Sequence, residues 1–207
     1  MDGSASSEYN SRGGFRRNLG LVKEFVREFI MSPNDARFGL VVFASEAGVE
    51  FTFGSHNTRD SLIADIDRIK FPGTATYLGG GLKLANDDLF AKAREDAKQI
   101  LIVLTDAMTY DDIKAPTKAI KDRGVEIYSV GVGIRQDDKI LAEMASSPKS
   151  EHVTSTPKRA NLNDVLRTIK QKICKGSSSF MCSGEAKHSS RSCYTQIYNC
   201  LNSPRQL

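Results

Sequence analysis

The sequence predicts an α/β fold: a doubly wound, mostly parallel central sheet flanked by helices. Short apolar segments rich in β-branched residues alternate along the chain with segments of helical periodicity. This alternation is typical of parallel strands joined by helices. The first long helix is preceded only by the polar stretch 1–12. The strand that normally precedes that helix is therefore expected to be missing from the chain.

The first half of the chain predicts three helices and two strands. Apolar residues at helical spacing predict helices over 15–30, 58–69 and 82–93. The apolar run 37–44 predicts a buried strand, and the alternating pattern at 49–53 predicts a second strand, antiparallel and nearer an edge. The glycines of 79–81 lie in a predicted loop. They lack the phosphate-binding pattern GxxxxGK[ST], so we expect them to serve a tight turn and close packing.

The second half continues the alternation. The run 99–104 is the most strongly apolar strand, and further strands are predicted over 125–132 and 152–154. Helices are predicted over 111–123 and 137–145, and a closing helix over 161–174. The three histidines, His56, His152 and His188, have no partner at ligand spacing, so we expect them on the surface.

Charge and hydropathy exclude several classes of function. The 207 residues contain 29 Lys and Arg against 25 Asp and Glu, a net charge of +4. The last 33 residues carry +3 of it and the first 174 only +1, so the main domain is near neutral and no nucleic-acid partner is expected. The longest apolar runs are far shorter than the ~20 residues of a membrane helix, so no membrane insertion is expected.

The chain divides into an α/β domain over 1–174 and a tail over 175–207. Eight residues of this tail are Ser and three are Cys. We expect it to be a linker or the start of a disulfide-rich module. The cysteines Cys174, Cys182, Cys193 and Cys200 indicate disulfides and an oxidising compartment, with three pairings open. The residues from Met1 to Glu8 show no signal peptide.

Three polar segments come where ligands bind in such sheets, beyond the carboxyl ends of strands. Asp2–Ser6 precedes the first helix, Gly73–Thr76 precedes the third, and Thr105-Asp106 follows the strand 99–104. Carboxylates and hydroxyls without His or Cys suit a hard cation such as Mg²⁺, with Mn²⁺ and Ca²⁺ as alternatives. An open position on that ion would attract a carboxylate from outside. No nucleophile with a His base is present, so we expect no enzyme.

These segments resemble those of the von Willebrand factor A domains, also called integrin I-like domains. Asp2-Gly3-Ser4-Ala5-Ser6 matches the D-x-S-x-S motif, Gly73-Thr74 the second loop, and Thr105-Asp106 the third. The resemblance runs from Asp2 to about Cys174 and is closest in character to extracellular-matrix members, matrilin- and collagen-VI-like. It implies a metal-ion-dependent adhesion site formed by Asp2, Ser4, Ser6, Thr74 and Asp106. Ser4, Ser6 and sometimes Thr74 would bind the ion directly, and the two aspartates would act largely through water.

The sequence departs from the family pattern in three places. The usual T-D-G reads Thr105-Asp106-Ala107, Tyr77 stands where Gly is common, and the apolar strand ending at Asp2 is absent. Ala107 is expected to tighten the turn after the strand, and Tyr77 to make the rim of the site bulkier. From the third we expect an N-terminally truncated domain that alone folds poorly or binds metal weakly. In the family, a Cys placed like Cys174 often pairs with one before the first strand. That pairing would leave three cysteines in the tail, so one of them would need a partner downstream or on another chain.

The function that the resemblance implies is a secreted or cell-surface adhesion or matrix-assembly module. It would bind an acidic side chain of a protein partner, such as a matrix component or receptor, through the cation. Oligomers would form through other parts of the parent protein. Two alternatives are a metal-independent interaction domain of the same fold and an intracellular domain of a multi-subunit machine, which the Cys-rich tail disfavours.

Overall fold

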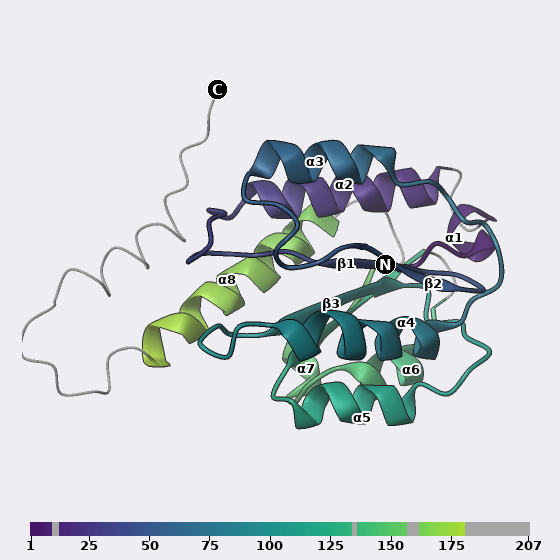
Figure 1. Ribbon diagram of the computed structural model, residues 1–207. Helices are drawn as coiled ribbons and strands as arrows, with labels where there is room; N and C mark the ends of the chain where they lie inside the picture. The colour runs from purple at the N-terminus through teal and green to yellow at the C-terminus, as the bar shows by residue number, and fades with distance from the viewer. Residues whose placement is uncertain (10–12, 134–135, 157–161, 181–207) are drawn as a thin grey trace, which may run out of the picture.

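The computed structural model describes residues 1–9, 13–133, 136–156 and 162–180. Two layers of helices enclose a central sheet (Figure 1). The predicted α/β architecture is confirmed. The elements in chain order are α1 (Ala5–Tyr9), α2 (Gly14–Arg27), β1 (Leu40–Phe43), β2 (Ala47–Phe51), α3 (Arg59–Arg68), α4 (Leu78–Leu84), a π-helical turn (Ala85–Leu89), a 3-10 turn (Phe90–Lys92), β3 (Ile100–Thr105), α5 (Lys114–Asp122), β4 (Glu126–Val132), α6 (Asp138–Met144), α7 (Lys149–His152), β5 (Val153–Thr156) and α8 (Leu162–Phe180).

The strands form two ladders. β1 pairs with β2 in antiparallel fashion, as predicted. β3, β4 and β5 pair in parallel in that order, and the register aligns Ile100 with Glu126 and Thr105 with Gly131. The carboxyl ends of β3 and β4 therefore meet at one edge of the sheet.

Residues Met1–Gly3 lie between the two ladders. The Gly3 N–H donates to the Phe43 carbonyl (2.8 Å) and the Phe43 N–H donates to the Met1 carbonyl (3.1 Å). On the other side, the Asp2 N–H donates to the Leu104 carbonyl (2.9 Å). Residues Met1–Gly3 thus bridge the two ladders and anchor Asp2 between Phe43 and Leu104.

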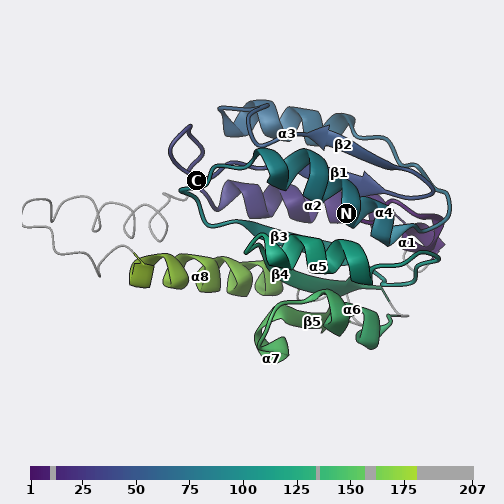
Figure 2. The ribbon, with the colours of Figure 1, turned by 60° about the horizontal axis from the view of Figure 1, so that its bottom comes forward.

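One hydrophobic cluster lies on each face of the sheet. The first joins β1, β3 and β4 to α4, α5 and α6, with Phe43, Val103 and Ile127 among its buried members. The second joins the other face to α2, α3 and α8, with Phe15 and Leu104. Figure 2 shows α2 and α3 on one side of the sheet and α5 on the other. The alternating side chains of the strands fill both clusters.

The structure corrects four details of the prediction. α4 begins at Leu78, so the glycines 79–81 lie in a helix rather than a turn. The short helix α7 was not predicted. α8 continues past Cys174 to Phe180, whereas the domain boundary at 174 stays a prediction. His152 is buried, with Nε2 2.7 Å from Glu126 Oε1; His188 lies outside the described residues.

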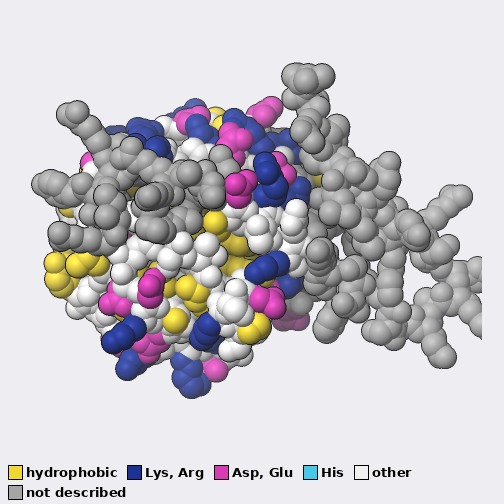
Figure 3. Space-filling view, turned by 180° about the vertical axis from the view of Figure 1, so that it is seen from behind, with side chains coloured by type: hydrophobic (Ala, Val, Ile, Leu, Met, Phe, Trp, Pro, Cys, Tyr) yellow, Lys and Arg dark blue, Asp and Glu magenta, His cyan; other side chains and the backbone are white. Residues whose placement is uncertain are grey.

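Basic and acidic side chains are interspersed on the face shown in Figure 3. Several exposed ion pairs join residues of one helix, such as Lys118 with Asp122 at 2.6 Å. No helix in the described part of the chain is both long and apolar enough to cross a bilayer. Mixed charge on this face fits the near-neutral balance predicted for the main domain.

Candidate metal site at the carboxyl edge of the sheet

The segment Asp2–Ser6 holds three of the predicted site residues together. Asp2 is fully buried. Its Oδ1 accepts the Ser4 N–H (2.9 Å), and its Oδ2 accepts the Thr105 hydroxyl (2.8 Å). The Ser4 and Ser6 hydroxyl oxygens lie 2.9 Å apart. Both serines sit at the start of α1, where Ser4 O also accepts the Ser7 hydroxyl (2.7 Å) and fixes the turn.

The loop that carries Thr74 is bonded to the first loop through backbone groups. The Ala5 N–H donates to the Thr74 carbonyl (2.8 Å), and the Gly73 N–H donates to the Gly3 carbonyl (3.0 Å). Gly73 has φ +67°, a left-handed conformation that glycine adopts without strain. The Thr74 hydroxyl accepts the Ser45 N–H (3.0 Å). Sequence reasoning did not identify Ser45, since it follows β1 in no recognisable motif.

The third loop follows β3. Asp106 is 2 % exposed, and its Oδ1 accepts the Met108 N–H (3.2 Å). Thr105 joins this loop to the first one through its bond to Asp2, and its hydroxyl also accepts the Ala107 N–H (2.9 Å). Thr105 therefore orients Asp2, a role that the sequence did not reveal. Ala107 has φ +60°, where the family pattern has Gly.

The donor set fits a hard divalent cation. Two neighbouring ligands of an octahedral Mg²⁺ ion at about 2.0–2.1 Å lie about 2.9 Å apart, the separation of the Ser4 and Ser6 hydroxyl oxygens. Asp2 is a buried carboxylate, and no Lys or Arg of the described residues forms an ion pair with it. A buried carboxylate calls for a positive charge nearby. Both Asp2 oxygens are engaged in hydrogen bonds, which suits contact with an ion through water.

Large apolar side chains surround these loops. The large hydrophobic residues that the described part exposes are Phe71, Tyr77, Met108 and Tyr110, from 39 % for Phe71 to 79 % for Tyr110. All four belong to the segments that carry Thr74 and Asp106 or border them. The rings of Tyr77 and Tyr110 are 6.4 Å apart, centroid to centroid. The rim is thus bulky at Tyr77, as expected, and apolar.

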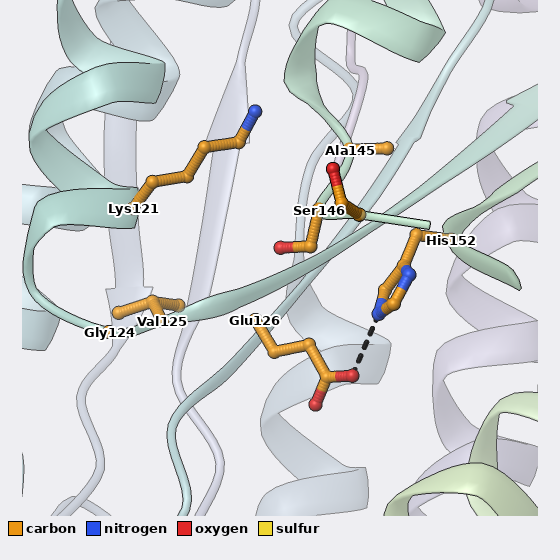
Figure 4. Close-up of a pocket in the computed structure, with 8 residues that line it drawn as sticks. Lys121, Gly124, Val125, Glu126, Ala145, Ser146 and His152 are labelled. Carbon is orange, nitrogen blue, oxygen red and sulfur yellow. Dashed lines mark hydrogen bonds and ion pairs between the residues drawn. The ribbon is translucent and has the colours of Figure 1, made fainter. Parts of the chain in front are cut away.

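A pocket of about 460 Å³ lies elsewhere, at the amino end of β4 (Figure 4). Its polar groups are engaged in the fold. Glu126 Oε1 accepts the Tyr128 hydroxyl (2.9 Å) and contacts His152, while Ser146 Oγ accepts the Ile127 N–H (2.9 Å). The Lys121 ammonium donates to the Glu143 carbonyl (2.9 Å). The register places this pocket at the opposite end of β4 from Asp106, so we assign it no role in the site.

Comparison with known proteins identifies the family. The model of the von Willebrand factor type A domain matches residues 1–168. Mouse vitrin is 30 % identical over 174 residues, which cover 84 % of this chain and 26 % of vitrin. Human cochlin is 30 % identical over 176 residues, which cover 84 % of this chain and 31 % of cochlin. The chain belongs to the von Willebrand factor type A domain family, and it spans about a quarter to a third of the length of these relatives.

Solved structures share the fold. One is proximal thread matrix protein 1 from the mussel byssus with a zinc-occupied MIDAS motif, with a TM-score of 0.74 and 23 % identity over 82 % of this chain and 45 % of that one. Another is manganese-loaded TRAP protein of Plasmodium vivax, with a TM-score of 0.69 and 17 % identity over 84 % of this chain and 70 % of that one. At these identities the likeness establishes the fold.

Proposed function

We propose that this domain is an extracellular adhesion or matrix-assembly module that binds an acidic side chain of a protein partner through a divalent cation. Asp2, Ser4, Ser6, Thr74 and Asp106 would hold the ion, with the two serine hydroxyls as direct ligands. The observation that carries the proposal is the convergence of the three loops. The buried Asp2 carboxylate of the first loop accepts the Thr105 hydroxyl from the third loop. The Ala5 N–H of the first loop donates to the Thr74 carbonyl of the second.

The structural neighbours support a divalent cation in general, since one has zinc at its MIDAS motif and another is loaded with manganese. We favour Mg²⁺, with Mn²⁺ and Ca²⁺ as alternatives, because the ligands here are all oxygens. Neutral hydroxyl ligands leave the ion with most of its positive charge. That charge, together with an open coordination position, would attract a carboxylate of the partner rather than activate water for a reaction.

The exposed apolar side chains around the site indicate which residues of the partner would lie beside its carboxylate. Exposed apolar patches mark interaction sites, and aromatic residues and Met are enriched in interface cores. Met108 and Tyr110 follow Asp106 closely in the chain and are 52 % and 79 % exposed. A partner with an apolar residue beside its Asp or Glu would bury these side chains while its carboxylate reached the ion.

An extracellular location is supported by the cysteine-rich tail and by the likeness to a thread matrix protein of the mussel byssus. The alternative that we retain is a domain of the same fold whose partner contacts need no metal. The two differ in whether the five residues bind an ion at all, so the first test concerns the metal alone.

The test is a titration of the chain with Mn²⁺, with free Mn²⁺ followed by electron paramagnetic resonance and Mg²⁺ added as competitor. We expect one weak, saturable site from which Mg²⁺ displaces Mn²⁺. Asp106→Ala should lower the affinity at least about tenfold, a loss of about 1.4 kcal/mol, with an unchanged thermal midpoint. The matched control is Asp60→Ala, an exposed acid in the first turn of α3. Equal binding by both variants would refute the proposal.

A further inference from the structure

The pocket at the amino end of β4 lies apart from the candidate metal site and has the size of a ligand pocket. Its volume is about 460 Å³, within the range of small-molecule sites, roughly 300–1,000 Å³. Its walls come from the end of α5, the first residues of β4, the segment after α6 and α7. Gly124 and Ser147, which line it, are exposed. A small molecule can therefore reach the pocket from solvent.

Two lysine ammonium groups gather at one side of this pocket. Lys121 of α5 donates to the Glu143 carbonyl (2.9 Å), and Lys149 of α7 donates to the Ala145 carbonyl. Both carbonyls lie at the carboxyl end of α6, which attracts cations through the helix dipole. Each ammonium carries more N–H donors than one carbonyl can use. Both lysines therefore keep donors for a ligand.

No carboxylate balances the charge of this lysine pair. Among the described residues, neither Lys121 nor Lys149 forms an ion pair, and the nearby Glu143 carboxylate pairs with Lys114 (3.8 Å). Burial and the Lys149 charge lower the pKa of Lys121, and Glu143 opposes this lowering only in part. Two neighbouring ammonium groups without a counter-ion favour the binding of an anion beside them.

The acid that lines the pocket, Glu126, is already neutralised by other groups. Its carboxylate pairs with Lys98 (2.7 Å), lies 2.7 Å from His152 Nε2 and accepts the Tyr128 hydroxyl (2.9 Å). Figure 4 shows the Glu126 carboxylate turned toward His152, with Lys121 on the other side of the pocket. Glu126 therefore does not cancel the positive charge of the lysine pair.

Two serine hydroxyls complete the set of donors. Ser146 and Ser147 both line the pocket. The Ser146 hydroxyl oxygen accepts the Ile127 N–H (2.9 Å), so its proton can be donated to a ligand. Ammonium and hydroxyl donors together suit a group with oxygens in several directions, such as sulfate or phosphate. Lysine binds such groups as a point charge.

We propose that the pocket at the amino end of β4 is an anion site that binds a sulfate or phosphate group, with Lys121 and Lys149 supplying the charge and Ser146 and Ser147 the hydroxyl donors. Such a group fills only part of the volume of about 460 Å³. The pocket therefore also has room for a sugar ring that carries the group. The site lies at the opposite end of β4 from the proposed cation site and is independent of it.

The test is a titration of the chain with sodium sulfate at constant ionic strength and without divalent cations, followed by the backbone amide resonances. The amides of Gly124, Ser146 and Ser147 should shift and saturate, with a Kd on the order of 1 mM. Lys121→Gln and Lys149→Gln should each raise the Kd at least about fivefold. Lys149 is exposed, so its variant tests the site independently of any effect of Lys121→Gln on folding.

The matched control is Lys118→Gln. Lys118 is an exposed lysine of the same helix that pairs with Asp122 (2.6 Å), and its loss changes the net charge by the same amount. The Kd of this variant should stay within about twofold of the original, because salt screens charges that lie away from the site. Shifts that never saturate, or an equal loss of affinity in the control and the two pocket variants, would overturn the proposal.

A parallel titration with inorganic phosphate and with N-acetylglucosamine 6-sulfate identifies the source of the bound group. Binding of the sugar sulfate at least as tightly as the free ions would support a site for a sulfated sugar. Binding of the free ions alone would support a site for the inorganic anion. Because no divalent cation is present, a failure of these experiments would leave the proposed cation site untouched.

Discussion

Single residues decide how tightly the third loop turns. Ala107 has φ +60° and is fully buried. Left-handed backbone costs an alanine about 1–2 kcal/mol relative to glycine. The turn is nevertheless held in place, because the Ala107 N–H donates to the Thr105 hydroxyl.

We expect Ala107→Gly to change the free energy of unfolding by no more than about 0.5 kcal/mol. Relief of the left-handed strain is offset by the loss of a buried methyl, about 0.8 kcal/mol, and by the greater freedom of the unfolded chain, about 0.4–1 kcal/mol. Ala107→Val should destabilise by at least about 2 kcal/mol, because β-branched residues avoid this conformation. Urea unfolding measures both. A stable Val variant would contradict the account.

Glu126 predicts a pH dependence of stability. Burial alone raises the pKa of its carboxyl, but hydrogen bonds from Lys98, His152 and Tyr128 outweigh burial and lower the pKa below its usual value. A carboxyl whose pKa is lower in the folded state stabilises the fold above its unfolded pKa, about 4.3, and loses that contribution as the pH falls through the folded value.

When the pH is lowered from 6 to 3, the urea midpoint of the original chain should therefore decrease more than the midpoint of Glu126→Gln. The Gln variant keeps the shape of the side chain but carries no charge. The control is Glu50→Gln. Burial raises the pKa of Glu50, so its charged form does not stabilise the fold. Equal acid sensitivity of the original chain and Glu126→Gln would show that the ionised Glu126 carboxylate is not responsible for the pH dependence.

At the scale of elements, α4 depends on glycine for its position. A Cβ on Gly79 would lie 2.0 Å from the Asp112 carbonyl oxygen, and one on Gly81 would lie 2.8 Å from Phe43 Cβ. The predicted close packing of these glycines is therefore right, although they belong to a helix. Periodicity could not show this, because glycine lacks the side chain that marks a helical face, and it is a poor helix former.

Gly79→Ala should destabilise the domain by about 1–3 kcal/mol, since the backbone of α4 and of the segment before α5 must move apart. Gly80→Ala is the matched control. Its Cβ would meet only Asp111 Oδ2 at 3.8 Å, so the usual advantage of alanine in a helix, about 0.5–1 kcal/mol, should appear as added stability. Thermal unfolding distinguishes them. The same effect from both substitutions would be inconsistent with this packing.

At the scale of the whole molecule, the sequence predicted the α/β layers and the succession of strands and helices along the chain, because both follow from alternating apolar periods. It also located the three loops, from two polar segments that precede helices and one that follows a buried strand. It did not reveal the contact of the buried His152 with Glu126 or the support that Thr105 and Ser45 provide. Those contacts join residues that are distant in the chain and carry no periodic signal.

The central claim is that Asp2, Ser4, Ser6, Thr74 and Asp106 together hold a divalent cation. The most direct measurement is anomalous diffraction from crystals of the chain grown with Mn²⁺. The account predicts a single strong peak within about 2.2 Å of both the Ser4 and the Ser6 hydroxyl oxygens, and none there for Asp106→Ala. No peak at this edge of the sheet at saturating Mn²⁺, or a peak bound by other residues, would contradict it.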